Sequence, residues 1–351
     1  MSEPPGQPAI SVVILNYNGQ KWLERCLESL QAQSIFGRIE VIIADNASTD
    51  ASDKMASQAM SGWTNGRFLQ NGANLGFCEG NNRGAALARG QYLFFLNPDA
   101  WLEKNCLEVL LKETEAAGAV AANPLVLDYD DDHFQHLICS GIDLFGLPNG
   151  AIRSAEVREV FAASGCGYLI RTDVFQRIGG FDREMFMYGD EIDLSWRVWI
   201  AGEKIVAVPQ ARMHHRGAVS ANPEGGTRIV ESRTNENKRF FTNRNALLNV
   251  LKNSQHVLLF LALMNLLLLT AEAVAALVLV RRWSFVKRGY LEAAQDCWRL
   301  RAHICEQRKQ INSYRRRGDF RMLRFLQLTP SRWPEIKRVF QMGVPRVDSA
   351  K

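Results

Sequence analysis

Three segments that resemble buried strands are each followed by polar side chains that could bind a nucleotide. The strand-like segments span 10–17, 39–45 and 91–96. The polar residues at their ends are Asn16, Asn18, Asp45, Asn97 and Asp99. Ligands of open α/β sheets bind beyond the carboxyl ends of the strands. We therefore expect these side chains to gather at one edge of a sheet.

Two carboxylates of this set have a specific chemical use. Asp45 could accept hydrogen bonds from a base or from ribose hydroxyls, although it could also be a turn residue ahead of a helix capped by Ser48 or Thr49. Asp99 could hold a divalent cation against a pyrophosphate. The alternative for Asp99 is an Asn-Pro-Asp turn that binds no ligand.

A segment rich in glycine and asparagine lies between the second and third of these strand ends. It runs from Asn74 to Gly84 and contains Gly76, Asn81 and Arg83. Free backbone N–H groups at the start of a helix, together with an arginine, suit an anionic group. The segment is neither a Walker A loop nor G-x-G-x-x-G, and neither motif occurs elsewhere in the chain, which argues against P-loop NTPases and dehydrogenases.

The second half contributes a cluster of carboxylates and a pair of histidines. Asp190, Glu191 and Asp193 fall within four residues at a predicted helix start, where ordinary first-turn enrichment explains one or two of them. Either Glu191 or Asp190 could deprotonate an acceptor hydroxyl. His214 and His215 could supply an imidazole to the metal at Asp99, although surface histidine pairs are commonly inert.

Strand and helix patterns alternate through the first half of the chain and predict how these residues are positioned. We expect helices near 20–33, 49–60, 78–89, 103–117 and 190–201, with further strands at 67–70, 118–122 and 163–171. Such alternation predicts an α/β fold with a mostly parallel central sheet and helices on both faces. The irregular stretch from 123 to 215 is expected to add mixed strands to that sheet.

The last hundred residues differ in composition from the rest. Residues 257–280 are almost wholly apolar, and residues 281–351 contain 18 Lys or Arg against 6 Asp or Glu in a chain of net charge +5. We therefore divide the chain into a catalytic domain, 1–250, and a membrane-associating extension, 251–351, that contains an apolar helix or helical hairpin and an Arg-rich helical tail. The first residues lack the features of a signal peptide.

Seven segments together resemble family 2 glycosyltransferases with the GT-A fold, in particular the bacterial rhamnosyltransferase-like branch. These segments are SVVILNYNG, DNASTD, NLGFCEGNNRG, FLNPDA, SGCGYLIR, GGFDREMFMYGDEIDLSWR and HHRG ahead of NRNALL. The resemblance implies that Asp45 holds the base, that Asp99 and His214 or His215 bind Mg²⁺ or Mn²⁺, and that Glu191 is the catalytic base. Two positions depart from the family pattern: Asn97 replaces the first carboxylate of Asp-x-Asp, and Asp190-Glu191 replaces the more usual Glu-Asp.

The resemblance implies an inverting, metal-dependent transfer of a sugar in cell-surface polysaccharide synthesis. The expected donor is dTDP-rhamnose, with UDP-hexoses as alternatives, and the acceptor is a glycan or a polyprenyl-linked sugar. We expect the enzyme at the cytoplasmic face of the membrane, with no nucleic-acid partner and a possible homo-oligomer. A buried helix in a dimer interface is the alternative for 257–280. A sugar nucleotidyltransferase and a non-catalytic sugar-nucleotide-binding protein are the competing functions.

Overall fold

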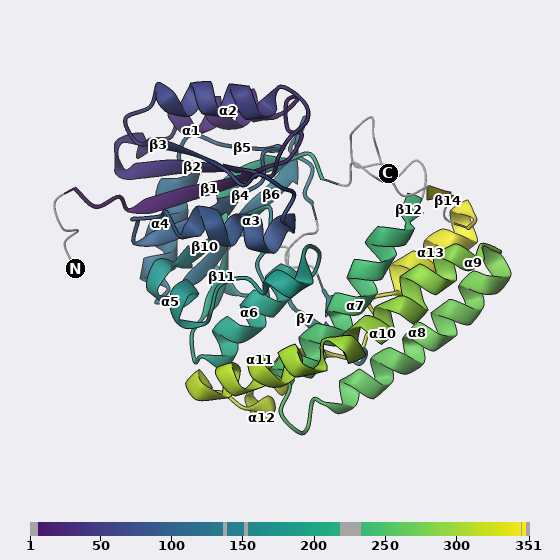
Figure 1. Cartoon of the computed structure of the whole chain (residues 1–351). Coiled ribbons are helices and arrows are strands. Elements are labelled where there is room, and N and C mark those ends of the chain that lie inside the picture. Colours follow the sequence, from purple (N-terminus) through teal and green to yellow (C-terminus); the bar gives the residue numbers. More distant parts are fainter. Residues whose placement is uncertain (1–5, 136–138, 151–153, 218–232, 345, 349–351) are drawn as a thin grey trace.

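A computed structural model describes residues 6–135, 139–150, 154–217, 233–344 and 346–348 (Figure 1). Its centre is a nine-stranded sheet with the strand order β3-β2-β1-β4-β10-β6-β11-β5, in which β9 also pairs with β11. The strands are β1 (Ile10–Asn16), β2 (Ile39–Asp45), β3 (Gly66–Gln70), β4 (Tyr92–Leu96), β5 (Ala100–Leu102), β6 (Ala121–Asp128), β9 (Arg158–Glu159), β10 (Gly167–Arg171) and β11 (Ile205–His215).

The sheet is parallel in its first half and mixed in its second. Strands β3, β2, β1 and β4 run parallel, whereas β10 is antiparallel to both β4 and β6. Strand β11 is parallel to β6 and antiparallel to β5. The predicted α/β fold with added mixed strands is confirmed. The pairing of β5 with β11 has no counterpart among the predicted elements.

Helices cover both faces of the sheet because its strands are apolar on both sides. One core contains Val12 and Phe94 with α1 (Leu23–Gln31), α2 (Ser52–Ser61) and α4 (Cys106–Ala116). The other core contains Val13 and Phe95 with α3 (Gly76–Ala85), α5 (Thr172–Arg177) and α6 (Asp190–Ile200). Successive strand residues point to opposite faces, which is why Val12 and Val13 belong to different cores.

The C-terminal region is helical and gathers beside the sheet domain (Figure 1). Its helices are α7 (Glu236–Asn253), α8 (Phe260–Leu279), α9 (Trp283–Val286), the π-helical η3 (Lys287–Glu292), α10 (Ala293–Arg299), α11 (Arg301–Tyr314), α12 (Asp319–Met322) and α13 (Trp333–Met342). Short helical turns η1 (Phe36–Arg38), η2 (Arg183–Met185) and η4 (Leu323–Phe325) complete the helical elements. Two small sheets join β13 (Leu326–Gln327), β7 (Gly141–Asp143) and β8 (Pro148–Asn149), and β12 (Arg233–Asn235) with β14 (Arg346–Asp348).

Helix α7 connects this region to the sheet domain. The core that contains α3 and α6 continues through Leu247 and Leu248 of α7 to Ile304 and Ile311 of α11. The boundary that we placed after residue 250 falls inside α7. The two regions therefore share a hydrophobic core across that position.

The apolar stretch at 257–280 forms one continuous helix, α8, over most of its length. By length and composition alone, α8 is able to cross a membrane. Two of its polar residues face the protein: the Asn265 side-chain amide donates to the Phe145 carbonyl over 2.8 Å, and Glu272 lies 3.0 Å from Arg332. The opposite face is exposed and apolar, with Leu263, Leu267, Val274 and Val278 each more than half exposed.

Candidate active site

The ends of β1 and β2 meet at Asn16 and Asp45, as the sequence predicts. The two residues are register partners and are fully buried, and the Asn16 amide donates to Asp45 Oδ1 over 2.7 Å. Asp45 also accepts from the Ser48 hydroxyl and backbone N–H, over 2.6 and 2.9 Å, and from Gln70 Nε2 over 3.0 Å. These donors bind both oxygens of Asp45, so the hydrogen bonds of this carboxylate stabilise the conformation of the 45–50 loop.

Asn18 ties the first strand end to the same loop. Its side-chain oxygen accepts from the backbone N–H of Thr49 over 2.8 Å, and its own N–H donates to Ser48 Oγ over 2.9 Å. Asn18 and Ala47 have φ values of 54° and 60°, a region that non-glycine residues rarely occupy. Strained backbone of this kind gathers at functional sites, where the surrounding contacts maintain it.

The start of α3 lies against both this loop and the loop ahead of α6. The Asn74 side chain accepts from Gly76 N over 3.0 Å, and the Asn46 amide donates to Gly76 O over 3.0 Å. Gly76 has a φ of 77°, and a Cβ there would lie 2.5 Å from the Phe186 ring. Glycine is therefore required for the close approach of the two loops.

Asn81 and Arg83 lie further along α3. The buried Asn81 donates to the Phe77 carbonyl of its own helix, and Arg83 in the last turn pairs with Glu79 over 3.4 Å. Among the described residues, no hydrogen bond or ion pair joins either side chain to the strand-end loops. Their assignment to nucleotide binding stays a prediction.

Asp99 and His215 come together because β5 pairs with the end of β11. Ala100 is the register partner of His215, and His215 Nε2 lies 3.4 Å from both Asp99 Oδ1 and Asn97 Nδ2. Burial raises the pKa of Asp99, but the hydrogen bond and charge of His215 outweigh burial and hold that pKa below its ordinary value. The carboxylate is a ligand type suited to Mg²⁺ or Mn²⁺, and the imidazole could bind a transition metal such as Mn²⁺ once it has lost its proton.

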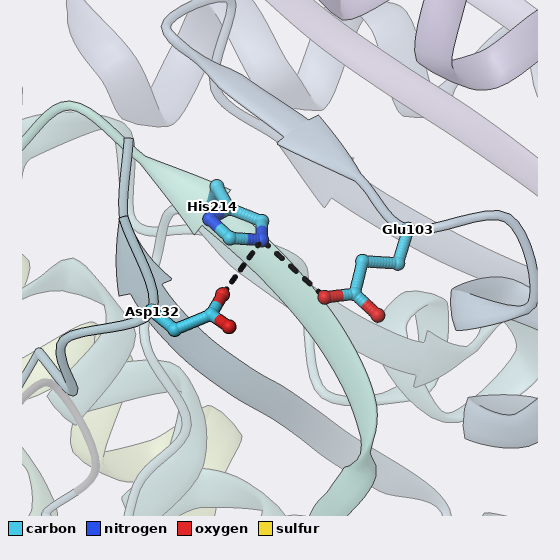
Figure 2. A group of neighbouring side chains, drawn as sticks. All are labelled: Glu103, Asp132 and His214. Atoms are coloured by element: carbon cyan, nitrogen blue, oxygen red, sulfur yellow. Dashed lines mark hydrogen bonds and ion pairs between the residues drawn. The ribbon is translucent and has the colours of Figure 1, made fainter. Parts of the chain in front are cut away.

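His214 points to the other side of β11, because neighbouring strand residues alternate. Its ring stacks on Trp101 at 3.8 Å, and its Nε2 lies 3.4 Å from Glu103 and 4.0 Å from Asp132 (Figure 2). These three side chains could hold a metal by ligand type. However, Arg212 lies 3.1 Å from Glu103 and 3.0 Å from Asp132 and already supplies their positive charge. Of the two histidines, the structure joins His215 alone to Asp99.

Four carboxylates surround the start of α6, and they differ in their partners. The buried Asp193 lies 2.7 Å from Arg197 and 3.0 Å from Lys252, which also pairs with Asp182. In the described parts of the chain, no cationic side chain pairs with Asp190 or Glu191. Burial and the charge of Glu191 raise the pKa of Asp190 well above its ordinary value. Burial also raises the pKa of Glu191.

Glu191 lies beside the segment that supports the metal-side residues. A Cβ on Gly165 would be 3.8 Å from Glu191 Cβ. The next residue, Cys166, accepts a hydrogen bond from Asn97 N over 3.2 Å. Glu191 and Asn97, which lies two residues before the predicted metal ligand Asp99, are therefore both next to the same short segment ahead of β10.

Residues of α7 hold the loop that precedes Asp190 and Glu191. Individually, these residues match no pattern in the sequence that indicates a function. Asn245 Nδ2 donates to the carbonyls of Met185, Met187 and Tyr188 over 2.9, 2.8 and 2.7 Å. Arg244 donates to Met185 O and Asn249 to Gly189 O, each over 2.9 Å. The only signal in the sequence was the string NRNALL within the family resemblance.

Comparison with known proteins identifies the family. A model described as Glycosyl transferase family 2 matches residues 11–179. N-acetylglucosaminyl-diphospho-decaprenol L-rhamnosyltransferase of Mycobacterium tuberculosis (strain H37Rv) is 29% identical over 250 residues, which cover 63% of this chain and 80% of that protein. Rhamnosyltransferase WbbL of Escherichia coli (strain K12) is 26% identical over 228 residues, covering 59% and 83%.

Solved structures share the fold. The crystal structure of GalNAc-T7 with UDP, GalNAc and Mn²⁺ matches 73% of this chain and 49% of that chain, with a TM-score of 0.57 at 17% identity. S. aureus TarS 1-349 matches 87% of this chain and 88% of that chain, with a TM-score of 0.52 at 14% identity. Residues 11–179 therefore form a glycosyl transferase family 2 domain, in a chain that has the GT-A fold.

Proposed function

We propose that this glycosyltransferase carries out a metal-dependent, inverting transfer from a nucleoside-diphosphate sugar. The observation that carries the proposal is that Glu191 lies next to Gly165, while the following residue, Cys166, is bonded to Asn97 beside the Asp99–His215 pair. This arrangement would bring a cation site and a proton acceptor to one substrate. No second nucleophile is needed in such a reaction.

Two groups of residues have separate roles in the proposed reaction, metal binding and proton acceptance. Asp99 and His215 would hold a divalent cation, which offsets the charge that develops on the departing nucleoside diphosphate. Glu191 accepts the proton of the acceptor hydroxyl as its oxygen bonds to the anomeric carbon and the bond to the diphosphate breaks. A single displacement of this kind inverts the anomeric centre. Burial and the neighbouring charge of Glu191 oppose the ionisation of Asp190 and raise its pKa well above the ordinary value, which favours Glu191 as the base.

For the substrates, we propose dTDP-rhamnose as donor, with UDP-hexoses as alternatives, and a lipid-linked saccharide as acceptor. Two relatives are named as rhamnosyltransferases, and one of these names includes a diphospho-decaprenol acceptor. The acceptor hydroxyl would approach Glu191 from the side opposite the nucleotide. The product extends a cell-surface polysaccharide.

We also propose that the enzyme works at the cytoplasmic face of the membrane. The exposed apolar face of α8 supports this location, as does the basic tail, because basic residues near an anionic surface contribute up to about 1 kcal/mol each. Nucleotide sugars are cytosolic, so the catalytic domain must lie on that side. Fractionation in high salt tests this proposal: we expect the chain to stay with membranes, and a freely soluble chain would contradict it.

A panel of nucleotide sugars, read by thermal shift, tests the donor. A ligand at one hundred times its dissociation constant adds about 2.7 kcal/mol to the free energy of unfolding. We expect the largest shift with dTDP-rhamnose in the presence of Mn²⁺, followed by turnover of that donor. Stabilisation by nucleoside triphosphates alone would instead favour a nucleotidyltransferase.

A further inference from the structure

An open, mainly apolar cavity of about 600 Å³ lies within the C-terminal helices, outside the sugar-transfer site. Its walls come from α8, α13, the start of α7 and the segment around Tyr290. The apolar lining includes Leu268, Ala275, Leu279, Phe285, Ile336 and Val339. A cavity of about 150 Å³ already holds a benzene ring, so this one has room for several five-carbon units of a hydrocarbon chain.

Charged side chains also line this cavity. Lys238 and Arg239 come from α7, Glu335 from α13, Arg332 from the position just before α13, and Glu272 from α8. Arg332 lies 3.0 Å from both Glu272 and Glu335, and Arg239 lies 3.8 Å from Glu272. Three cations thus face two carboxylates. Burial and the neighbouring charge of Arg239 lower the pKa of Lys238, and an anion beside it would favour its charged form.

Helix α7 links the charged part of the cavity to the catalytic loop. Phe241 lies one turn beyond Lys238, and its ring stacks on Phe186 at 5.1 Å. Asn245, which holds the loop ahead of Glu191, lies a further turn along α7. At 1.5 Å per residue, Lys238 and Asn245 are about 10 Å apart along the helix axis. A saccharide attached to an anionic group near Lys238 would extend toward Glu191.

We infer that this cavity binds the isoprenoid chain of a lipid diphosphate, with the diphosphate at Lys238 and Arg239. The inference rests on the proposed lipid-linked acceptor and assigns a second binding site for it. Helix α8 forms one wall of the cavity and exposes its other face, so a chain could enter directly from a bilayer in which α8 is seated.

Farnesyl diphosphate is a suitable probe, because it carries both a short isoprenoid chain and a diphosphate. Calorimetric titration of the full-length protein should detect its binding, with much weaker binding of inorganic diphosphate or farnesol alone. Ala275→Trp fills the cavity from an exposed position and should weaken binding by at least about tenfold, or 1.4 kcal/mol. Val278→Trp is the matched control, because it lies one turn away on the exposed face of α8 outside the cavity lining and should leave affinity unchanged.

The titration separates this inference from the proposed reaction. Binding that is lost in Ala275→Trp and kept in Val278→Trp supports the cavity assignment even where no sugar transfer is detected. The assignment is overturned if the affinity for farnesyl diphosphate is unchanged in Ala275→Trp, or if inorganic diphosphate binds as tightly as farnesyl diphosphate. Either result holds even for an active transferase. Lys238→Gln should reduce the preference for farnesyl diphosphate over farnesol.

Discussion

Carboxylates lie close together both at the strand-end edge and at the start of α6. The two regions differ in the groups that stabilise the negative charge. At the strand ends, amides, hydroxyls and an imidazole surround Asp45 and Asp99. At the α6 start, buried cations neutralise Asp182 and Asp193, whereas Glu191 has no cationic partner among the described residues. The pKa of Asp99 is lowered and that of Glu191 is raised. Environments that separate two pKa values in this way distinguish a charged ligand from a proton acceptor.

The sharpest way to break this comparison is to remove the proposed proton acceptor. We expect Glu191→Gln to lower kcat by about a hundredfold or more, because a general base typically contributes that much. Asp190→Asn should keep a measurable fraction of activity, because burial and the charge of Glu191 raise the pKa of Asp190 and oppose its ionised form. Steady-state transfer assays, with circular dichroism as the control for folding, measure both. The reverse ranking of the two variants would make Asp190 the base.

Replacement of the metal-side residues tests the other half of the comparison. Asp99→Asn should reduce turnover by about a hundredfold or more, and chelation by EDTA should do the same to the native enzyme. His215→Gln should raise the Mn²⁺ concentration needed for half activity, whereas His214→Gln should not, because His214 lies across β11 beside Arg212. Equal metal dependence in the two histidine variants would contradict the assignment.

Lys252 tests whether the paired carboxylates are structural. Lys252→Met leaves the buried Asp182 and Asp193 without this cation, which should cost about 3–5 kcal/mol of unfolding free energy. Both aspartates have pKa values below their ordinary range, although burial opposes the shift. Their contribution is therefore present above about pH 4 and is lost as the pH falls through the folded-state values. Urea denaturation across pH should show this acid loss, and the variant should show less of it.

The contacts from α7 can be tested separately from the carboxylates. Asn245→Ala removes three hydrogen bonds to the strained loop that precedes Asp190, so we expect kcat to fall by about tenfold while the KM for the donor is unchanged. Asn249→Ala removes one such bond and should have a smaller effect. A change in donor KM alone would mean that the loop does not position the base.

The pH profile provides the smallest and most specific test. Transfer requires ionised Glu191, and its raised pKa places the acid limb of kcat above the ordinary glutamate range. Asp190→Asn should leave that limb in place, because burial raises the pKa of Glu191. A limb that moves to lower pH in Asp190→Asn would show that the charge of Asp190 contributes to the raised pKa of Glu191.

Local patterns in the sequence were sufficient to predict the alternating strands and helices. They also predicted the polar residues at the ends of β1, β2 and β4. They were also sufficient to predict that Asn16 and Asp45 meet. They were insufficient to separate His214 from His215, because that difference depends on the pairing of β5 with a strand more than a hundred residues away. Nor did they identify Asn245, whose partners lie about sixty residues away and are backbone carbonyls, which leave no trace in residue identity.

Helix α7 has a consequence for how this enzyme can be recombined with its relatives. A chimera joined within α7 ahead of Asn245 would combine Asn245 and Lys252 from one parent with Asp182 and the catalytic loop from another. Such a chimera would inherit a mismatched hydrogen-bond and charge network even where each parental half was intact. Grafting a new tail to change the acceptor therefore requires that α7 be kept with the sheet domain, with the junction placed beyond Asn253.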